Sequence, residues 1–293
     1  MYDAIIVGAR CAGSPLAMLL ARQGHKVLLV DKGSFPSDIM STHGLKPPAT
    51  AKLKEWGLLD SVLVSNCPPV HTQELNFGPF SLSGSSPGVD GVRFLVAPRR
   101  KVLDTILVDA AVAAGAELRE HFTVGEVLFE DGIVTGIRGH ERGGREVTER
   151  ARIVIGADGR HSDVAKAVGV PTIIDRGTFC CAYYSYFSGV PTDRVTLYPR
   201  PGRFAITFPT NDDLTVVLVE WPREEFQPFG RTSKEFPADA RDGARTRRAV
   251  RATGRALHWH GRPAELPTQG IWARLGAGWR CSQSQGSYSR SGH

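Results

Sequence analysis

The hydrophobic pattern is most informative in the first 31 residues of the chain. An apolar run at 4–7 is followed by a glycine-containing turn, a segment with helical spacing at 12–23 and a second apolar run at 27–30. Short apolar runs are typical of buried parallel strands, and the segment between them has the period of a helix. The pattern predicts one βαβ unit.

Later segments extend this predicted sheet. Apolar residues at helical spacing indicate a helix that starts near Arg100 and stops at Gly115, and 117–122 can form another parallel strand. Asp131-Gly132 joins two β runs and is the strongest hairpin signal in the chain. A buried strand at 153–155, a turn at 156–159 and a helix from about Ser162 complete a second strand–turn–helix element.

Two other stretches have a β-rich pattern. Runs at 73–77 and 92–96 flank a Gly/Ser/Pro-rich connection, and runs at 179–187, 194–198, 204–208 and 214–221 alternate with turns, as in an antiparallel sheet. An aromatic stripe on this sheet could line a substrate cavity or belong to its core; it comprises Tyr183, Tyr184, Tyr186, Phe204 and Phe208.

These patterns predict an α/β protein, with a doubly wound Rossmann-like domain and an inserted antiparallel β-sheet domain. We expect residues 1–66 and 98–172 to form the first domain and residues 67–97 and 173–230 the second. Residues 231–293 are expected to form a basic, partly disordered tail.

The first βαβ unit carries residues suited to an adenine dinucleotide. Gly8 ends the first strand, Gly13 lies where the helix packs closely on it, and Asp31 ends the second strand. Backbone N–H groups from Gly8 to Ser14 and the positive end of the helix dipole suit a diphosphate, while Asp31 can accept from ribose hydroxyls. The spacing matches the dinucleotide fingerprint.

One position departs from that fingerprint, because Arg10 stands where a second glycine is usual. Its side chain either points away from the ligand or contacts phosphate itself, and we favour the phosphate contact because guanidinium suits phosphate oxygens. The predicted turn contacts also include Cys11 and Ala12, and Lys32 follows Asp31.

Three further places could face the cofactor. In the loop after the first unit, Ser41, Thr42 and His43 are candidates, although His43 could equally be a solvated loop histidine. Arg99 and Arg100 begin a helix, where a cation needs an anionic partner, either a ligand or a nearby carboxylate. In the second strand–turn–helix, Asp158 could bind a sugar or ribityl hydroxyl, and Gly159 lets the backbone approach closely.

Composition excludes several other classes of protein. The net charge of +6 arises in residues 231–293, which hold 12 of the 36 basic and 4 of the 30 acidic residues, so the rest carries −2. That tail lacks a recognised nucleic-acid-binding motif, so we expect no nucleic-acid partner. The spacing of the five cysteines indicates neither a disulfide framework nor a metal site. Without a membrane-length apolar run or a signal sequence, we expect a cytoplasmic protein.

These motifs together make the chain similar to flavoprotein monooxygenases of the para-hydroxybenzoate hydroxylase type and their geranylgeranyl-reductase-like relatives. The resemblance covers about residues 2–225 and rests on the G-x-R-x-x-G turn, Asp31, Arg100-x-x-Leu103 and the Gly156–Gly159 turn. It implies FAD as cofactor and NAD(P)H as transient reductant. It also implies a flavin C4a-hydroperoxide that hydroxylates an aromatic or polyketide-like small molecule. Because the flavin carries this chemistry, we name no catalytic base.

Matching positions receive roles from this resemblance. Gly8, Arg10, Gly13 and Ser14 would hold the FAD diphosphate and Asp31 the adenosine ribose. Arg100 would face the diphosphate or flavin, Val124 the adenine, and Asp158 and Gly159 the sugar and phosphate region. The resemblance extends equally to FAD-dependent reductases of isoprenoid double bonds, which stay an alternative function.

The C-terminal stretch differs from the family pattern. Gly278-Trp279 resembles the start of the family's third motif, but no Gly-Asp turn follows. We interpret residues 281–293 as disordered and hypothesise a truncation or frameshift, which makes an inactive flavin-fold remnant a further alternative. The substrate, the choice of nicotinamide and the oligomeric state stay open.

Overall fold

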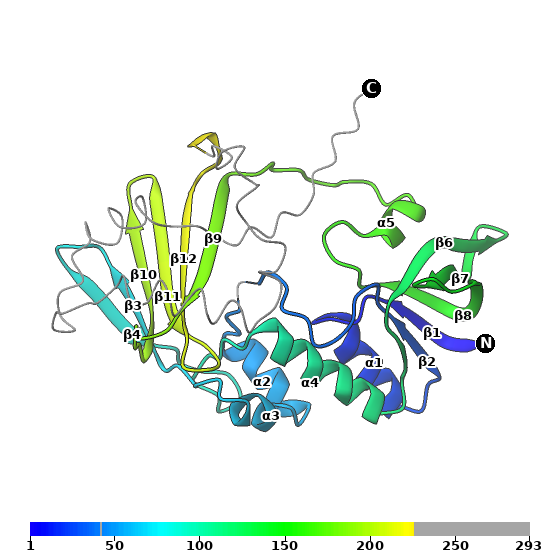
Figure 1. The fold of residues 1–293 in the computed structure, drawn as a ribbon, viewed down its shortest axis with the longest axis horizontal. Coiled ribbons are helices and arrows are strands. Elements are labelled where there is room, and N and C mark those ends of the chain that lie inside the picture. The colour runs from blue at the N-terminus through cyan, green and yellow to red at the C-terminus, as the bar shows by residue number, and fades with distance from the viewer. Residues whose placement is uncertain (42, 226–293) are drawn as a thin grey trace. The chain divides into compact units, whose positions relative to one another are not determined.

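A computed structural model describes residues 1–41 and 43–225 of the chain (Figure 1). The chain divides into two compact units, each built around one six-stranded sheet. Among the described residues, the first unit comprises 1–41, 43, 53–65 and 98–176, and the second comprises 44–52, 66–97 and 177–225. The predictions for Thr42 and for the tail at 231–293 lie outside the described residues.

The sheet of the first unit has the strand order β5-β2-β1-β8-β7-β6. Its parallel part consists of β5 (Glu117–Arg119), β2 (Val27–Val30), β1 (Tyr2–Val7) and β8 (Glu146–Gly156). Strands β7 (Ile133–Glu141) and β6 (Phe122–Glu130) add to β8 in antiparallel fashion. The arrangement confirms the predicted Rossmann-like α/β class.

Helices α1, α4 and α5 of this unit lie where the sequence predicts them. Helix α1 (Gly13–Arg22) links β1 to β2 and packs against α4 (Arg100–Ala113), as Figure 1 shows. Helix α3 (Leu59–Val64) also contacts α4, and the short α5 (Asp163–Ala167) follows β8, with the Ser162 hydroxyl capping its first turn. Helix α2 (Pro47–Glu55) has residues in both units.

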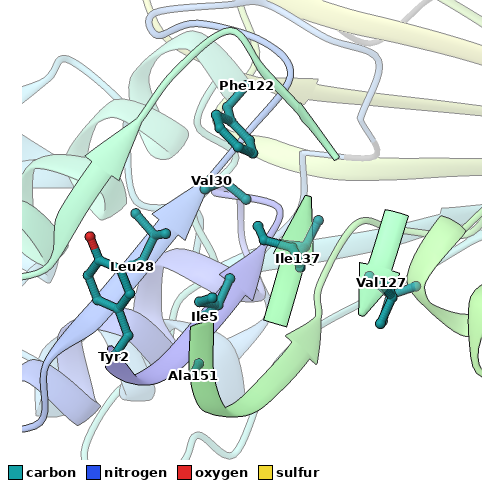
Figure 2. Packing of buried hydrophobic residues seen from close by; sticks show 10 residues of the cluster. Tyr2, Ile5, Leu28, Val30, Phe122, Val127, Ile137 and Ala151 are labelled. Carbon is teal, nitrogen blue, oxygen red and sulfur yellow. The ribbon is translucent and has the colours of Figure 1, made fainter. Parts of the chain in front are cut away.

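Apolar side chains from five strands form the core of the first sheet (Figure 2). Ile5 of β1, Leu28 of β2 and Ile137 of β7 are completely buried, and Phe122 of β6 is 1% exposed. Tyr2 joins this core, with its hydroxyl donating to Glu117 over 2.6 Å. The predicted cofactor turn therefore follows a strand, β1, that is buried in this core, and β2, which comes after the turn and helix α1, is buried in the same core.

The predicted hairpin at Asp131-Gly132 is confirmed between β6 and β7. Asp131 has φ 50° and Gly132 has φ 78°, the left-handed pair that a tight two-residue turn requires. The predicted strand at 117–122 is interrupted, because His121 adopts φ 53° and separates β5 from β6.

The second unit contains a sheet of order β4-β3-β10-β11-β12-β9. All neighbouring strands are antiparallel except β3 (Thr72–Asn76) and β10 (Arg194–Arg200), which are parallel. The remaining strands are β4 (Ser81–Ser85), β9 (Cys180–Phe187), β11 (Arg203–Pro209) and β12 (Thr215–Pro222), and a 3₁₀ turn follows at Arg223–Glu225. Phe208 is buried with Ala97 and Val216, and Tyr184 and Tyr186 pack against them. These aromatics therefore belong to the core of the sheet.

Two sequence expectations for this unit were wrong. The run at 92–96 forms isolated bridges, Val92 with Val89, Leu95 with Val70 and Val96 with Leu45, instead of a strand. The Gly/Ser/Pro-rich connection contains β4, whose exposed residues form a strand through their pairing with β3. In the described part of the chain, no helix has the length and apolar character to cross a membrane.

Candidate cofactor site

The carboxyl ends of β1 and β8 lie side by side and bring two turns together. Val7 is paired with Gly156, and the Ala157 amide donates to the Val7 carbonyl over 2.7 Å. Gly8 has φ 105°, and a Cβ atom there would lie 2.4 Å from the Ala157 oxygen. Only glycine fits at position 8, because a side chain would both strain the backbone and collide with the second turn.

The start of α1 is suited to an anion. No side chain caps the helix at Ala12, and its first turn contains no acidic residue. Ser14 is completely buried, and its hydroxyl oxygen has no hydrogen-bond partner among the described residues. An uncapped helix N-terminus with a buried, unsatisfied hydroxyl has the donors that a phosphate group accepts from.

Asp31 connects the first turn to the end of β2. One carboxylate oxygen accepts from the Ala9 amide over 2.8 Å, and the other accepts from the Gly33 amide over 2.7 Å. The residue is 8% exposed. Each carboxylate oxygen can accept a second hydrogen bond, so Asp31 both shapes the turn and keeps acceptor capacity for a ligand hydroxyl.

Arg10 is held by protein groups on three sides. Its Nη1 donates to Asp104 over 2.7 Å, its Nη2 donates to Ser37 over 3.1 Å, and its guanidinium carbon lies 5.1 Å from the Phe35 ring centroid. These two hydrogen bonds use two of the five guanidinium donors. The neighbouring residues Cys11 and Ala12 are exposed, and the Cys11 sulfur lies 3.6 Å from Asp104 Oδ1.

The two arginines at the start of α4 have carboxylate partners. Arg100 donates to Asp104 through Nε over 2.8 Å and through Nη2 over 2.9 Å, and Arg99 donates through Nε to Asp38 over 2.9 Å. Both therefore form the ion pairs that the sequence left as one of two alternatives. Asp38 ties the loop after β2 to the start of α4.

His43 is not a solvated loop residue, which corrects one of the two sequence interpretations. It is 3% exposed, adopts φ 59°, and its amide donates to the Ser41 hydroxyl over 3.0 Å. Burial, opposed by the Asp38 carboxylate, lowers the pKa of its imidazole to about 4. His43 is therefore neutral at physiological pH.

The two carboxylate oxygens of Asp158 have different surroundings. Oδ2 accepts from the amides of Asp163 over 2.7 Å and Val164 over 3.2 Å, so it caps α5. Oδ1 is buried and has no hydrogen-bond partner among the described residues. Gly159 has φ 89° and open space around it. This side of the turn therefore offers an unsatisfied acceptor beside accessible backbone.

The last two predicted residues are Lys32 and Val124. Lys32 is exposed; together with Lys166, whose effect is larger, its charge lowers the pKa of Asp163 at the start of α5. Val124 lies in β6, pairs with Gly139 and packs against the core. Two residues before it, the Phe122 amide donates to the Asp31 carbonyl.

Sequence reasoning missed the residue that links most of these groups, Asp104. It is completely buried on α4 and accepts from Arg10, Arg100 and Cys11. The available signal was its position, because it shares the buried stripe of α4 with Leu103, Leu107, Val108 and Ala111. An acid in an apolar stripe needs buried partners.

Comparison with known proteins shows which cofactor the family of this chain binds. A family model described as an FAD binding domain matches residues 1–261. The chain belongs to this FAD-binding family. Its cofactor is FAD, as the sequence resemblance implied, and its relatives include oxidoreductases and monooxygenases.

Three of these relatives illustrate the family. A digeranylgeranylglycerophospholipid reductase of Methanocella arvoryzae is 33% identical over 59% of this chain and 43% of its own length. A rifampicin monooxygenase of Streptomyces venezuelae is 29% identical over 78% of this chain and 43% of its own length. A crystal structure of P. aeruginosa PqsL in complex with 2-aminobenzoylacetate has 25% identity and a TM-score of 0.67, covering 76% of this chain and 62% of that one. The chain thus spans less than half the length of these two curated relatives.

The residues present fit FAD. The unpartnered Ser14 hydroxyl and the uncapped start of α1 suit its diphosphate, and Asp31 suits a ribose diol. The unsatisfied Oδ1 of Asp158 is an acceptor for a hydroxyl group of the cofactor.

Proposed function

We propose that the protein is an FAD-dependent monooxygenase that hydroxylates an aromatic or apolar small molecule with O₂ and NAD(P)H. In this reaction one oxygen atom enters the substrate and the other leaves as water, while NAD(P)H supplies two electrons. Bound FAD supplies the electron transfer and the activation of O₂. The first unit would bind FAD, and the second, with its antiparallel sheet, would serve the substrate.

The single observation that carries this proposal is the pair of turns at the ends of β1 and β8, within a matched FAD family. We assign the diphosphate to residues Gly8–Ser14, including the backbone at Cys11 and Ala12, and the ribose to Asp31. Arg10 and Arg100 contribute positive charge beside the diphosphate, and Asp158 and Gly159 contact the sugar and phosphate region. Lys32, His43 and Val124 complete the proposed contacts around the adenosine and the flavin.

The aromatic substrate class is supported by a solved relative, PqsL, whose crystal structure holds 2-aminobenzoylacetate. A second candidate function, reduction of isoprenoid double bonds, is favoured by the 33% identity to a digeranylgeranylglycerophospholipid reductase. Both functions need FAD, and they differ in whether O₂ is consumed.

The first experiment records the visible spectrum of the purified protein after loading with FAD and gel filtration. Flavin bands that persist support the proposed site, whereas a colourless protein would favour the inactive remnant. NAD(P)H oxidation is then followed with a panel of phenols and prenyl lipids, in air and under anaerobic conditions. Incorporation of isotopically labelled O₂ into a phenol supports the monooxygenase, and anaerobic saturation of a prenyl double bond would contradict it.

Ser14→Ala tests the assignment of the turn. Removing an unsatisfied buried hydroxyl should leave the free protein equally or more stable, yet it should weaken FAD binding by roughly tenfold, because one charge-assisted hydrogen bond to the anionic phosphate is lost. Ser65→Ala is the matched control, because the Ser65 hydroxyl donates to the Val62 carbonyl at 2.6 Å and is not part of the turn. Unchanged FAD affinity in Ser14→Ala would remove Ser14 from the site.

A further inference from the structure

Two arginines meet on one buried carboxylate beside the turn. Asp104 is completely buried, while the side chains of Arg10 and Arg100 are 23% and 14% exposed. Arg10 comes from the turn between β1 and α1, whereas Arg100 and Asp104 both come from α4. Arg10 and Asp104 are 94 residues apart in the sequence. Asp104 therefore links two segments that both border the proposed diphosphate site.

The geometry restrains both guanidinium groups. Arg100 binds both carboxylate oxygens of Asp104, Oδ1 through Nε at 2.8 Å and Oδ2 through Nη2 at 2.9 Å, and Arg10 Nη1 shares Oδ2 at 2.7 Å. Arg10 is further fixed by the Ser37 hydroxyl and the face of Phe35. A planar guanidinium held along one edge and one face keeps its orientation without a ligand.

The charges of this group have a definite sign. Two guanidiniums and one carboxylate carry a formal net charge of +1, so the trio attracts an anion although it contains a buried acid. An acid this close to a diphosphate opposes binding by simple Coulomb repulsion. Its presence needs a compensating effect, and the contacts provide one, because the acid determines where both cations point.

We propose that Asp104 is a positioning residue for the cofactor diphosphate, acting through Arg10 and Arg100. The inference rests on the proposed FAD site in the first unit. Preorganised donors bind more tightly because the ligand does not have to order them, which is the benefit that offsets the repulsion by Asp104.

The substitution Asp104→Asn should change ADP affinity in opposite directions, depending on whether Asp104 acts through its charge or by positioning the arginines. Neutralising the acid raises the net charge of the trio, which by charge alone would strengthen binding of ADP, a probe containing the diphosphate and adenosine. Loss of positioning should instead weaken ADP binding roughly tenfold, the value of one charge-assisted hydrogen bond. Binding of adenosine, which lacks phosphate, should not change. ADP binding as tight as or tighter than in the natural protein would overturn the proposal.

A second variant and a control separate this role from general stability. Asp104→Glu keeps the charge but displaces the carboxylate by one methylene. If Asp104 positions the arginines, this variant should bind ADP more weakly; if only its charge matters, ADP affinity should not change. Glu149→Gln removes another arginine-paired carboxylate of the same unit, 2.7 Å from Arg119, and should leave ADP affinity unchanged. Both are measured by calorimetric titration well below the unfolding temperature.

A double-mutant cycle tests whether Asp104 acts through Arg10. If it does, Asp104→Asn and Arg10→Gln together weaken ADP binding by less than the product of their separate effects. Independent, multiplicative effects would contradict action through Arg10. If the natural protein binds neither FAD nor ADP, the proposed function itself fails; if it binds both and the Asp104 variants match it, only this inference fails.

Discussion

A Cβ atom on Gly13 would lie 1.8 Å from the carbonyl oxygen of Gly8. The first turn of α1 therefore rests directly on the backbone at the end of β1, and neither group can move away without breaking the turn. Gly13→Ala should destabilise the protein by about 3 kcal/mol, at the upper end for overpacking, and should abolish FAD retention. Urea unfolding and gel filtration with FAD measure the two effects.

Gly84→Ala is the control for that substitution. Gly84 lies in the exposed strand β4 with nothing within 4 Å of its added Cβ, so its replacement should change stability by no more than about 0.5 kcal/mol. If Gly13→Ala is as mild as Gly84→Ala, the close approach of helix and turn is not a constraint in solution.

Asp31→Asn should weaken FAD binding more than FMN binding. The amide of Asn offers one acceptor oxygen, so either Ala9 or Gly33 loses its partner and the ribose loses an acceptor. FMN lacks the adenosine, and its affinity should be nearly unchanged. Asp3→Asn is the matched control, because Asp3 also accepts from a backbone amide, that of Lys26 over 2.8 Å, but is half-buried and lies at the other end of β1. Equal losses for FAD and FMN would place Asp31 away from the ribose.

Local signals were sufficient for the elements that carry the turns. The apolar runs of β1 and β2 lie where the sequence predicts them, because parallel strands buried on both faces are uniformly apolar. Asp131-Gly132 determines its hairpin through the backbone conformations of these two residues. Gly8, Gly13 and Asp31 were recognisable as site candidates for the same reason, since their spacing follows from one local unit.

Non-local contacts explain what sequence reasoning missed. Strand β4, Ser81–Ser85, has no alternation of its own and exists through pairing with β3. Asp104 was not a candidate because its partner Arg10 is 94 residues away, and a single acid in a helix carries no local signature of that contact. The burial of His43 likewise depends on the fold around it and not on its neighbours in a loop of polar residues.

Cys11 should be protected from alkylation by FAD. Loss of solvent around the sulfur, aided by the Asp104 carboxylate and opposed by Arg100, raises the pKa of its thiol, so it reacts slowly at neutral pH and faster in alkaline buffer. Residue 11 is exposed in the proposed diphosphate turn, and bound FAD should block access to it. Peptide mass spectrometry after iodoacetamide treatment measures the labelling at each cysteine.

Cys67 provides the internal control for this measurement. It is 1% exposed, and burial raises the pKa of its thiol to about 11, so it should remain unlabelled with or without FAD while the protein is folded. Equal labelling of Cys11 at zero and saturating FAD would show that the cofactor does not cover the turn.

His43 should make the protein less stable in mild acid. Its pKa is about 4 in the folded protein against the ordinary histidine value of 6.5, so the unfolded chain binds the proton more readily. Stability is therefore complete above about pH 6.5 and falls as the pH decreases to about 4, by up to about 3 kcal/mol. His43→Asn removes the titrating group and suits the φ of 59°, because Asn tolerates the left-handed region. The difference in unfolding free energy between the natural protein and this variant, measured by urea unfolding across this range, should change in favour of the variant as the pH falls. A difference that is constant with pH would mean that His43 is as easily protonated in the folded protein as in the unfolded chain.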